Sequence, residues 1–118
     1  MADFERLNAW RRAHELALLA YRLTQALPNA EGFGLTDQIR RAAVAVPANI
    51  AEGHGRANDT EFRGFLSVAL GSLSELQALM LLARDLGYLA EADLTEFWQL
   101  AAQVGKMTAA LQATLKRR

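Results

Sequence analysis

The sequence contains no cysteine and only two prolines among its 118 residues. Without cysteine the chain cannot form disulfide bonds, thiolate metal sites or a catalytic thiol. Valine and isoleucine are scarce beside alanine and leucine, which lose little side-chain freedom in a helix. The composition therefore favours a helical protein.

An excess of either charge is also lacking, because 13 basic and 13 acidic residues give a formal net charge of +0. A neutral chain has no overall attraction to nucleic acid or to an anionic membrane, so either partner would need a local patch. The most apolar stretch, residues 65–83, is interrupted by serines, Glu75 and Gln77, and we expect no membrane-spanning segment. The first residues lack the basic-then-apolar order of a signal peptide, and we expect a cytoplasmic protein.

Apolar residues make up 52% of the chain, which is enough for a core, and the length suits one domain over residues 1–118. Their spacing predicts helices over about residues 8–27, 35–52 and 59–86 and from residue 91 or 93 onward. In the last two segments the spacing alternates strictly between three and four, at Phe62, Leu66, Ala69, Leu73, Leu76, Met80 and Ala83 and at Leu94, Phe97, Ala101, Val104, Thr108, Leu111 and Leu115. Short connections make successive helices antiparallel, so we predict an all-α, antiparallel up-down-up-down four-helix bundle.

Residues that favour helix ends separate these segments. Pro28 stops the first helix, Asn58 is suited to cap the start of the third, and Gly87 ends it. Gly32 and Gly34 leave the first connection free to adopt positive φ.

The second segment carries a group of residues with expected structural roles: Pro47, Asn49, Glu52 and Gly53. Proline removes the hydrogen bond to the Ala43 carbonyl, so we expect a bend at Pro47. Gly53 is placed to be a left-handed C-cap. Asn49 either donates to a carbonyl near the proline or, with Glu52, belongs to a polar strip for a partner.

Some apolar side chains lie outside the predicted core faces, namely Leu18, Leu19, Phe65, Val68, Leu70, Leu79, Leu81 and Leu82. The third helix also carries a stripe of small residues: Gly64, Ser67, Gly71, Ser74 and Ala78. Contiguous exposed apolar surface marks interfaces, and small residues let another helix approach closely. We therefore predict a homo-oligomer with an interface that includes Leu18, Gly64, Ser67, Gly71 and Ser74. The alternative is that some of these side chains pack within the bundle.

The sequence contains no recognisable catalytic or metal-binding constellation. The two histidines, His14 and His54, have no partner at ligand spacing, and the Glu-x-x-His pairs of di-iron bundles are missing. Ser72 and Ser74 lie in a helix without a histidine base nearby, and the glycines at 32–34 and 53–55 lack a phosphate-loop motif. We therefore predict no enzyme activity, metal, cofactor or small-molecule substrate.

The candidate binding residues are Arg11, Arg12, Arg22, Arg40 and Arg41. If they converged on one face of an oligomer, symmetry would multiply a modest basic patch into a surface for nucleic acid or another partner. The alternative is ordinary surface charge, with a nearby glutamate at position 15 offsetting the first two arginines, and the overall neutrality favours it.

The second helix carries a motif that resembles a known family. Residues 33–35 read FGL and residues 38–53 read QIRRAAVAVPANIAEG, and further matches cover nearly the whole chain. The sequence resembles bacterial four-helix-bundle proteins encoded in intervening sequences of large-subunit ribosomal RNA genes, a family that includes the accessory variability determinant of diversity-generating retroelements. The resemblance implies a ring-shaped homopentamer without enzymatic activity. For the retroelement branch it also implies a basic surface that contacts RNA or DNA and a reverse transcriptase, and the balanced charge of this chain departs from that branch.

Overall fold

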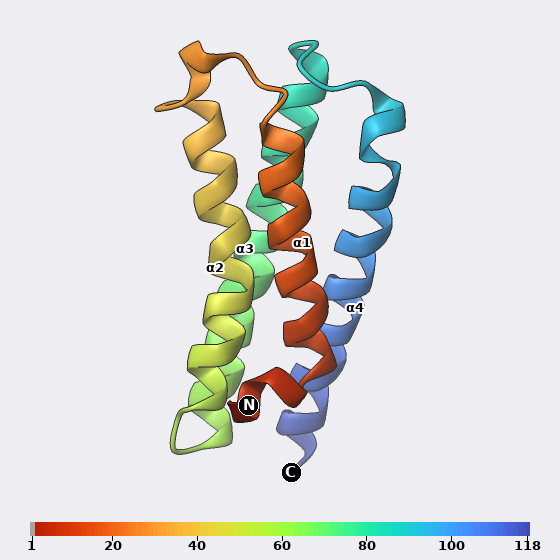
Figure 1. Ribbon diagram of the computed structural model, residues 1–118. Coiled ribbons are helices and arrows are strands. Elements are labelled where there is room, and N and C mark those ends of the chain that lie inside the picture. Colours follow the sequence, from red (N-terminus) through yellow and green to blue (C-terminus); the bar gives the residue numbers. More distant parts are fainter. Residues whose placement is uncertain (1) are drawn as a thin grey trace.

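The computed structural model describes residues 2–118, which form four long helices: α1 (Asn8–Thr24), α2 (Leu35–His54), α3 (Asp59–Asp85) and α4 (Thr95–Arg117). Short 3-10 turns at Asp3–Arg6, Asn29–Glu31 and Glu91–Leu94 precede α1, α2 and α4. The helices run alternately up and down (Figure 1), and α2 packs on α1 and α3 while α4 packs on α3 and α1. The predicted all-α, antiparallel four-helix bundle is confirmed.

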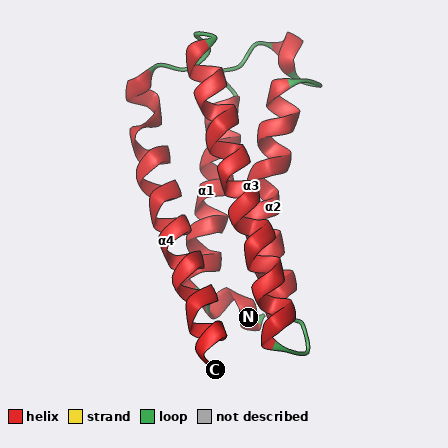
Figure 2. Ribbon diagram, turned by 180° about the vertical axis from the view of Figure 1, so that it is seen from behind, coloured by secondary structure: helices red, strands yellow, loops and turns green. Residues whose placement is uncertain are grey.

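The bundle is elongated, with extents of 46 × 24 × 24 Å. Its connections are confined to the two ends, as the view from behind shows (Figure 2). We call the end with the chain termini and the α2–α3 connection the lower end, and the end with the α1–α2 and α3–α4 connections the upper end.

α3 supplies a continuous stripe of the core. Its buried residues are those of the predicted seam: Phe62, Leu66, Ala69, Leu73, Leu76, Met80 and Ala83. The seam of α4 is likewise buried except for Leu111, which is only partly buried. Alternating spacings of three and four keep one face of a helix toward its neighbours, so the periodicity predicts the buried side chains well.

The ends of α3 follow the predicted signals. The side chain of Asn58 accepts a hydrogen bond from the backbone N–H of Glu61 at 2.9 Å and caps the start of the helix. Gly87 has a φ of 83°. The N–H of Tyr88 donates to the carbonyl of Ala83 at 3.0 Å, which is the Schellman closure that favours glycine at the left-handed position.

Gly53 has a different role from the left-handed C-cap expected from the sequence. α2 continues to His54, and Gly53 is buried within the helix. A Cβ at this position would lie 2.7 Å from the Cβ of Phe65 and 2.9 Å from Cδ1 of Phe62. Glycine fits here because the backbone of α2 approaches α3 too closely for a side chain.

Other local predictions also need correction. Gly32 and Gly34 have φ values of −55° and −112° rather than positive ones. The first helix ends at Thr24 because the next turn is of the tighter kind, with the N–H of Leu27 donating to the Thr24 carbonyl at 3.1 Å. Leu19, which we expected outside the core face, is buried.

By length and composition alone α3 could cross a membrane, and it is the one such helix in the part of the chain that the structure describes. Length and composition do not decide whether α3 spans a membrane, so the expectation of no membrane-spanning segment stays a prediction. One face of α3 nevertheless packs in the bundle core, and a core helix of a bundle can meet the same criterion.

Replacing Gly53 with alanine tests the close approach of α2 to α3. Alanine favours a helix over glycine by roughly 1 kcal/mol, but overpacking against Phe65 costs about 1–3 kcal/mol. We expect Gly53→Ala to lower the free energy of unfolding in urea by about 1 kcal/mol overall. The control is Gly71→Ala, because a Cβ there meets no atom within 4 Å. That variant should be slightly more stable than the parent, and a stabilised Gly53→Ala would contradict the tight crossing.

Candidate functional site

An apolar groove lies between the outer faces of α1 and α2. Its volume is ≈ 320 Å³, and it is lined by His14, Ala17, Leu18, Tyr21, Val44 and Pro47. Leu18 and Val44 expose 48% and 45% of their surface. Because large apolar side chains are exposed here on two adjacent helices, the groove is a candidate interaction surface.

α2 continues through Pro47 without a break, and Pro47 is one of the residues that line the groove. The carbonyl that loses its usual donor to the proline is that of Ala43. The nearby Asn49 side chain instead donates to the carbonyl of Ala45 at 2.7 Å. The structure thus places the Asn49 amide in a bond within its own helix, at the edge of the outer face of α2.

Glu52 completes the group of residues singled out near the end of α2. Its carboxylate pairs with Arg56 at 2.8 Å, and both side chains are exposed. Gly53 lies instead at the buried crossing with α3. Pro47, Asn49, Glu52 and Gly53 therefore serve different local contacts and do not form one site.

Arg40 fastens α2 to α1 beside the groove. Its Nε donates to Oγ1 of Thr24 at 2.9 Å, and its Nη2 donates to the carbonyl of Tyr21 at 3.3 Å. The guanidinium carbon lies 4.6 Å from the centroid of the Tyr21 ring, a cation–π contact. Arg40 therefore holds the tyrosine ring in place, and much of its hydrogen-bonding capacity is used within the chain.

Arg11 and Arg12 lie near the start of α1. The Nε of Arg11 donates to the carbonyl of Glu5 at 2.6 Å. Arg12 pairs with Glu15 at 2.8 Å, so of these two arginines it is Arg12 whose charge Glu15 offsets directly. Both arginines are exposed, and exposed pairs of this kind contribute little to stability.

Arg22 and Arg41 lie in the upper half of the bundle. Arg41 pairs with Asp37 at 2.8 Å, and Arg22 is exposed. Along α1, Arg22 is roughly 16 Å from Arg11 at the helical rise per residue. The structure therefore brings Arg22, Arg40 and Arg41 toward one end of the α1–α2 face and leaves Arg11 and Arg12 nearer the other end.

The small residues of α3 lie on its outer surface. Gly64, Ser67, Gly71 and Ser74 are all exposed. A Cβ at Gly64 or Gly71 would meet no atom within 4 Å, so the space above them is open. Ser67 differs from the others because its Oγ accepts a hydrogen bond from Nε2 of Gln112 in α4 at 2.7 Å.

Sequence reasoning missed Phe33 and Arg63. Phe33 is fully exposed, at 104%, in the α1–α2 connection, where periodicity gives no information. The feature of the sequence that could have indicated it is a large apolar residue placed between two glycines, Gly32 and Gly34. Arg63 lies in the second turn of α3, and its Nε is buried without a hydrogen-bond partner. The environment of Arg63 depends on α4, so local sequence could not reveal it.

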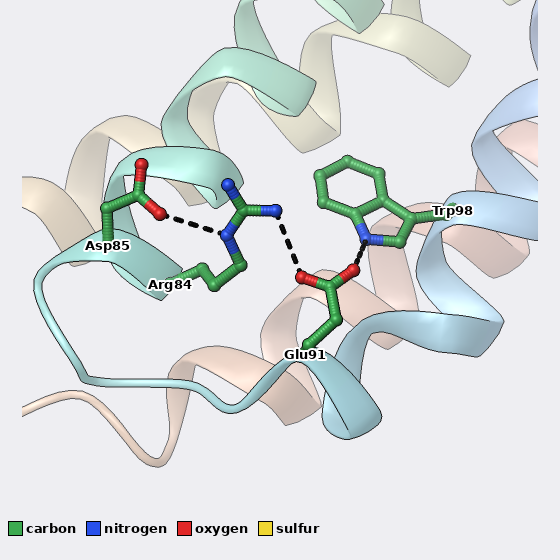
Figure 3. A network of polar contacts seen from close by, with 4 residues as sticks. All are labelled: Arg84, Asp85, Glu91 and Trp98. Atoms are coloured by element: carbon green, nitrogen blue, oxygen red, sulfur yellow. Dashed lines mark hydrogen bonds and ion pairs between the residues drawn. The ribbon is translucent and has the colours of Figure 1, made fainter.

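A polar network holds the α3–α4 connection at the upper end (Figure 3). Arg84 pairs with Asp85 and with Glu91, each at 3.0 Å, and Glu91 accepts a hydrogen bond from Nε1 of Trp98 at 3.3 Å. The hydrogen bonds to Asp85 and then Glu91 raise the pKa of Arg84 above its ordinary value. The network joins the 3-10 turn before α4 to both helices, which is a structural role.

Tyr88 links the two connections of the upper end. Its hydroxyl donates to Oε2 of Glu31 at 2.9 Å, across 57 residues of sequence. This hydrogen bond to a carboxylate raises the pKa of the Tyr88 phenol, and desolvation adds to the shift. Because the folded-state pKa is raised, the bond stabilises the fold at pH below the ordinary tyrosine pKa of about 10. That contribution is lost as pH rises through the folded-state value.

Glu31→Gln should lower the pKa of Tyr88 toward its ordinary value, because the neutral amide no longer disfavours the phenolate. The measurement is the absorbance of tyrosinate during an alkaline titration, in a Tyr21→Phe background so that one of the two tyrosines remains. Glu61→Gln, on the opposite end of the bundle, is the matched control. An unchanged titration in Glu31→Gln would show that the link is not formed in solution.

Among residues 2–118 no three histidine, aspartate or glutamate side chains are grouped so as to hold a metal ion. The features that remain are surfaces: the apolar groove of α1 and α2, the exposed face of α3 and the basic side chains.

The comparisons with known proteins agree with this fold. The model of a family described as 23S rRNA-intervening sequence protein matches residues 5–110. A crystal structure of a protein with unknown function, from the S23 ribosomal protein family of Bacteroides thetaiotaomicron VPI-5482, is similar with a TM-score of 0.81 and 20% identity. The similarity covers 88% of this chain and 97% of that chain. At this identity the likeness shows the fold alone, and no curated protein matches the chain.

Proposed function

The chain belongs to the 23S rRNA-intervening sequence protein family, and on this premise we propose that it is a non-enzymatic homo-oligomeric scaffold built from helical bundles. The match confirms the family resemblance read from the sequence, and that resemblance implies five copies in a ring. The observation that carries the proposal is the apolar groove of α1 and α2, where Leu18, Tyr21 and Val44 are exposed in the single chain.

The groove fits an interface with another copy better than a small-molecule site. A site for a small molecule encloses its ligand and directs a few polar groups at it. Here the lining is almost wholly apolar and open to solvent, and the nearby guanidinium of Arg40 is engaged by Thr24 and Tyr21. Covering such a surface with a partner removes apolar area from water, at about 25 cal/mol per Å².

A ring requires that two different surfaces of each chain meet, since a contact between identical surfaces closes a dimer. The groove would supply one surface. Exposed apolar side chains elsewhere offer the second, and they include Val68, Leu81 and Leu82 of α3 and Phe33 in the α1–α2 connection. We assign the outer face of α3 as the opposing surface, because it extends over most of the bundle length.

Val44→Glu tests the groove as the assembly surface. The position is exposed in the single chain, so we expect the helical fold to be kept, as circular dichroism would show. Even with Arg41 three residues away on the same helix, a carboxylate at a chain–chain contact loses its hydration, and the oligomer should dissociate at least partly to monomers. The measurement is mass in solution by light scattering over a range of concentrations.

The matched control for this test is Ala102→Glu, an exposed position on α4. It adds the same charge away from the groove and should leave the mass unchanged. A parent chain that stays monomeric at high concentration would refute the scaffold proposal. A parent oligomer that Val44→Glu does not affect would refute only the assignment of the groove.

Nucleic-acid binding is a second candidate function, favoured by basic residues at the lower end of the bundle. Arg6, Lys116 and Arg117 are exposed there and carry no ion pair among the described residues, unlike Arg12, Arg41 and Arg56. A symmetric assembly would repeat this basic end. Without such binding, the protein would be a purely structural protein–protein interaction oligomer.

The double variant Arg6→Gln with Arg117→Gln should weaken binding to a structured RNA in a mobility-shift assay at low salt. Each lost phosphate contact reduces the dependence of log affinity on log salt by roughly 0.9. Arg84→Gln, at the upper end, is the control and should bind as the parent does. Absence of any shift by the parent at low salt would exclude the nucleic-acid role and leave the structural one.

A further inference from the structure

A second hollow, separate from the apolar groove, lies between the start of α3 and the end of α4. Its volume is ≈ 450 Å³. Small residues leave this space open, because Gly64 faces Ala109 and Ala113 across the two helices. Nothing lies within 4 Å of a Cβ placed on Gly64. The remaining lining residues are polar: Arg63, Ser67, Gln112 and Lys116.

Arg63 is the unusual member of this lining. Its Nε is buried and has no hydrogen-bond partner, although buried donors are nearly always satisfied. The one contact of its guanidinium is a long hydrogen bond from Nη2 to Oγ1 of Thr60, at 3.5 Å. A guanidinium offers five N–H groups in a planar fork. The buried Nε is out of reach of a ligand, so the Nη groups are the ones that can donate to it.

Gln112 fixes the geometry of the hollow. Its Nε2 donates to the carbonyl of Arg63 at 3.0 Å and to Oγ of Ser67 at 2.7 Å, which ties α4 to α3 at this point. Since Oγ of Ser67 accepts this bond, its hydroxyl hydrogen is left to donate elsewhere. The arrangement presents a hydroxyl donor beside the Arg63 guanidinium.

Both charged side chains in the lining are positive. Arg63 and Lys116 contribute cations, and no carboxylate lines the hollow. Asp59 accepts two hydrogen bonds from Arg118, at 3.0 and 2.9 Å, and its pKa is lowered by Arg118 and to a smaller extent by Arg63. A lysine at the end of α4 also suits the helix dipole, but that role explains neither the buried Arg63 donor nor the space above Gly64.

We propose that this hollow binds a phosphate group, with Arg63 and Lys116 as cationic partners and the Ser67 hydroxyl as a further donor. Phosphate fits better than a carboxylate because donors from two helices converge on it and its several oxygens can accept from each. The volume also exceeds that of one phosphate, so the group would be part of a larger molecule such as a nucleotide or the backbone of RNA. Gly64 and Ser67 are also predicted at the oligomer interface, so this site requires that the contact between copies leave this end of α3 uncovered.

The test is isothermal titration of the full chain with three probes: inorganic phosphate, adenosine monophosphate and a short single-stranded RNA. We expect Arg63→Gln and Lys116→Gln each to weaken binding by about tenfold or more, the usual effect of losing a charged hydrogen bond. Gly64→Leu should block the hollow without changing any charge and have a similar effect. The control is Arg84→Gln, which removes the same charge from the upper end and should bind as the parent does.

The outcomes separate the sources of the phosphate. Saturable binding of inorganic phosphate or of the mononucleotide, lost in Gly64→Leu, assigns the site to a free phosphate compound. Binding of the RNA alone, lost in the same variant, assigns it to a backbone phosphodiester. Failure of the parent to bind all three probes, or equal weakening by Arg84→Gln, would overturn the proposal. The assembly proposal is tested separately by the mass in solution. Circular dichroism of each variant establishes that a loss of binding is not a loss of fold.

Discussion

The close approach of α2 to α3 at Gly53 constrains the rest of the bundle. Because the backbone of α2 lies against Phe62 and Phe65 with no side chain between them, the rotation of α2 about its axis is fixed. With this face of α2 turned inward, Val44 must lie on the side toward α1 and solvent. The groove is therefore a consequence of core packing. The motif around Pro47 both forms part of α2 and contributes to the surface of the groove.

The sequence predicted the core faces better than the details at helix ends. The seam of α3 was predictable because strict spacings of three and four admit one buried stripe. Leu19 was not, since α1 buries a wider face than one such stripe where it meets two neighbours. The role of Gly53 was misread for a related reason: a glycine near a helix end suits both a cap and a close crossing, and the Phe65 Cβ that decides between them comes from another helix.

The contacts of surface side chains were harder to predict than those of the core, because an exposed charged side chain has several possible partners within reach. Glu15 could pair with an arginine three or four residues away, and the structure selects Arg12. The contact of Arg40 with Tyr21 and Thr24 crosses between helices, so no local pattern indicated that this cation is engaged. The hollow around Arg63 depends on Gln112, which lies 49 residues away in sequence. Such sites require the register of two helices, which amphipathic patterns do not specify.

The formal net charge of +0 argued against a polyanionic partner, but the charges are not evenly distributed along the bundle. The upper end carries Glu31, Glu91, Asp93 and Glu96 beside Arg84, whereas the lower end carries Arg6, Arg63, Lys116 and Arg117 beside Asp3, Glu5 and Asp59. In a ring whose bundles lie along the symmetry axis, every chain points the same way. The fields of the basic ends then add on one face of the ring, and those of the acidic ends add on the other. Neutrality of the single chain therefore does not weigh against a phosphate-bearing partner that approaches the lower end.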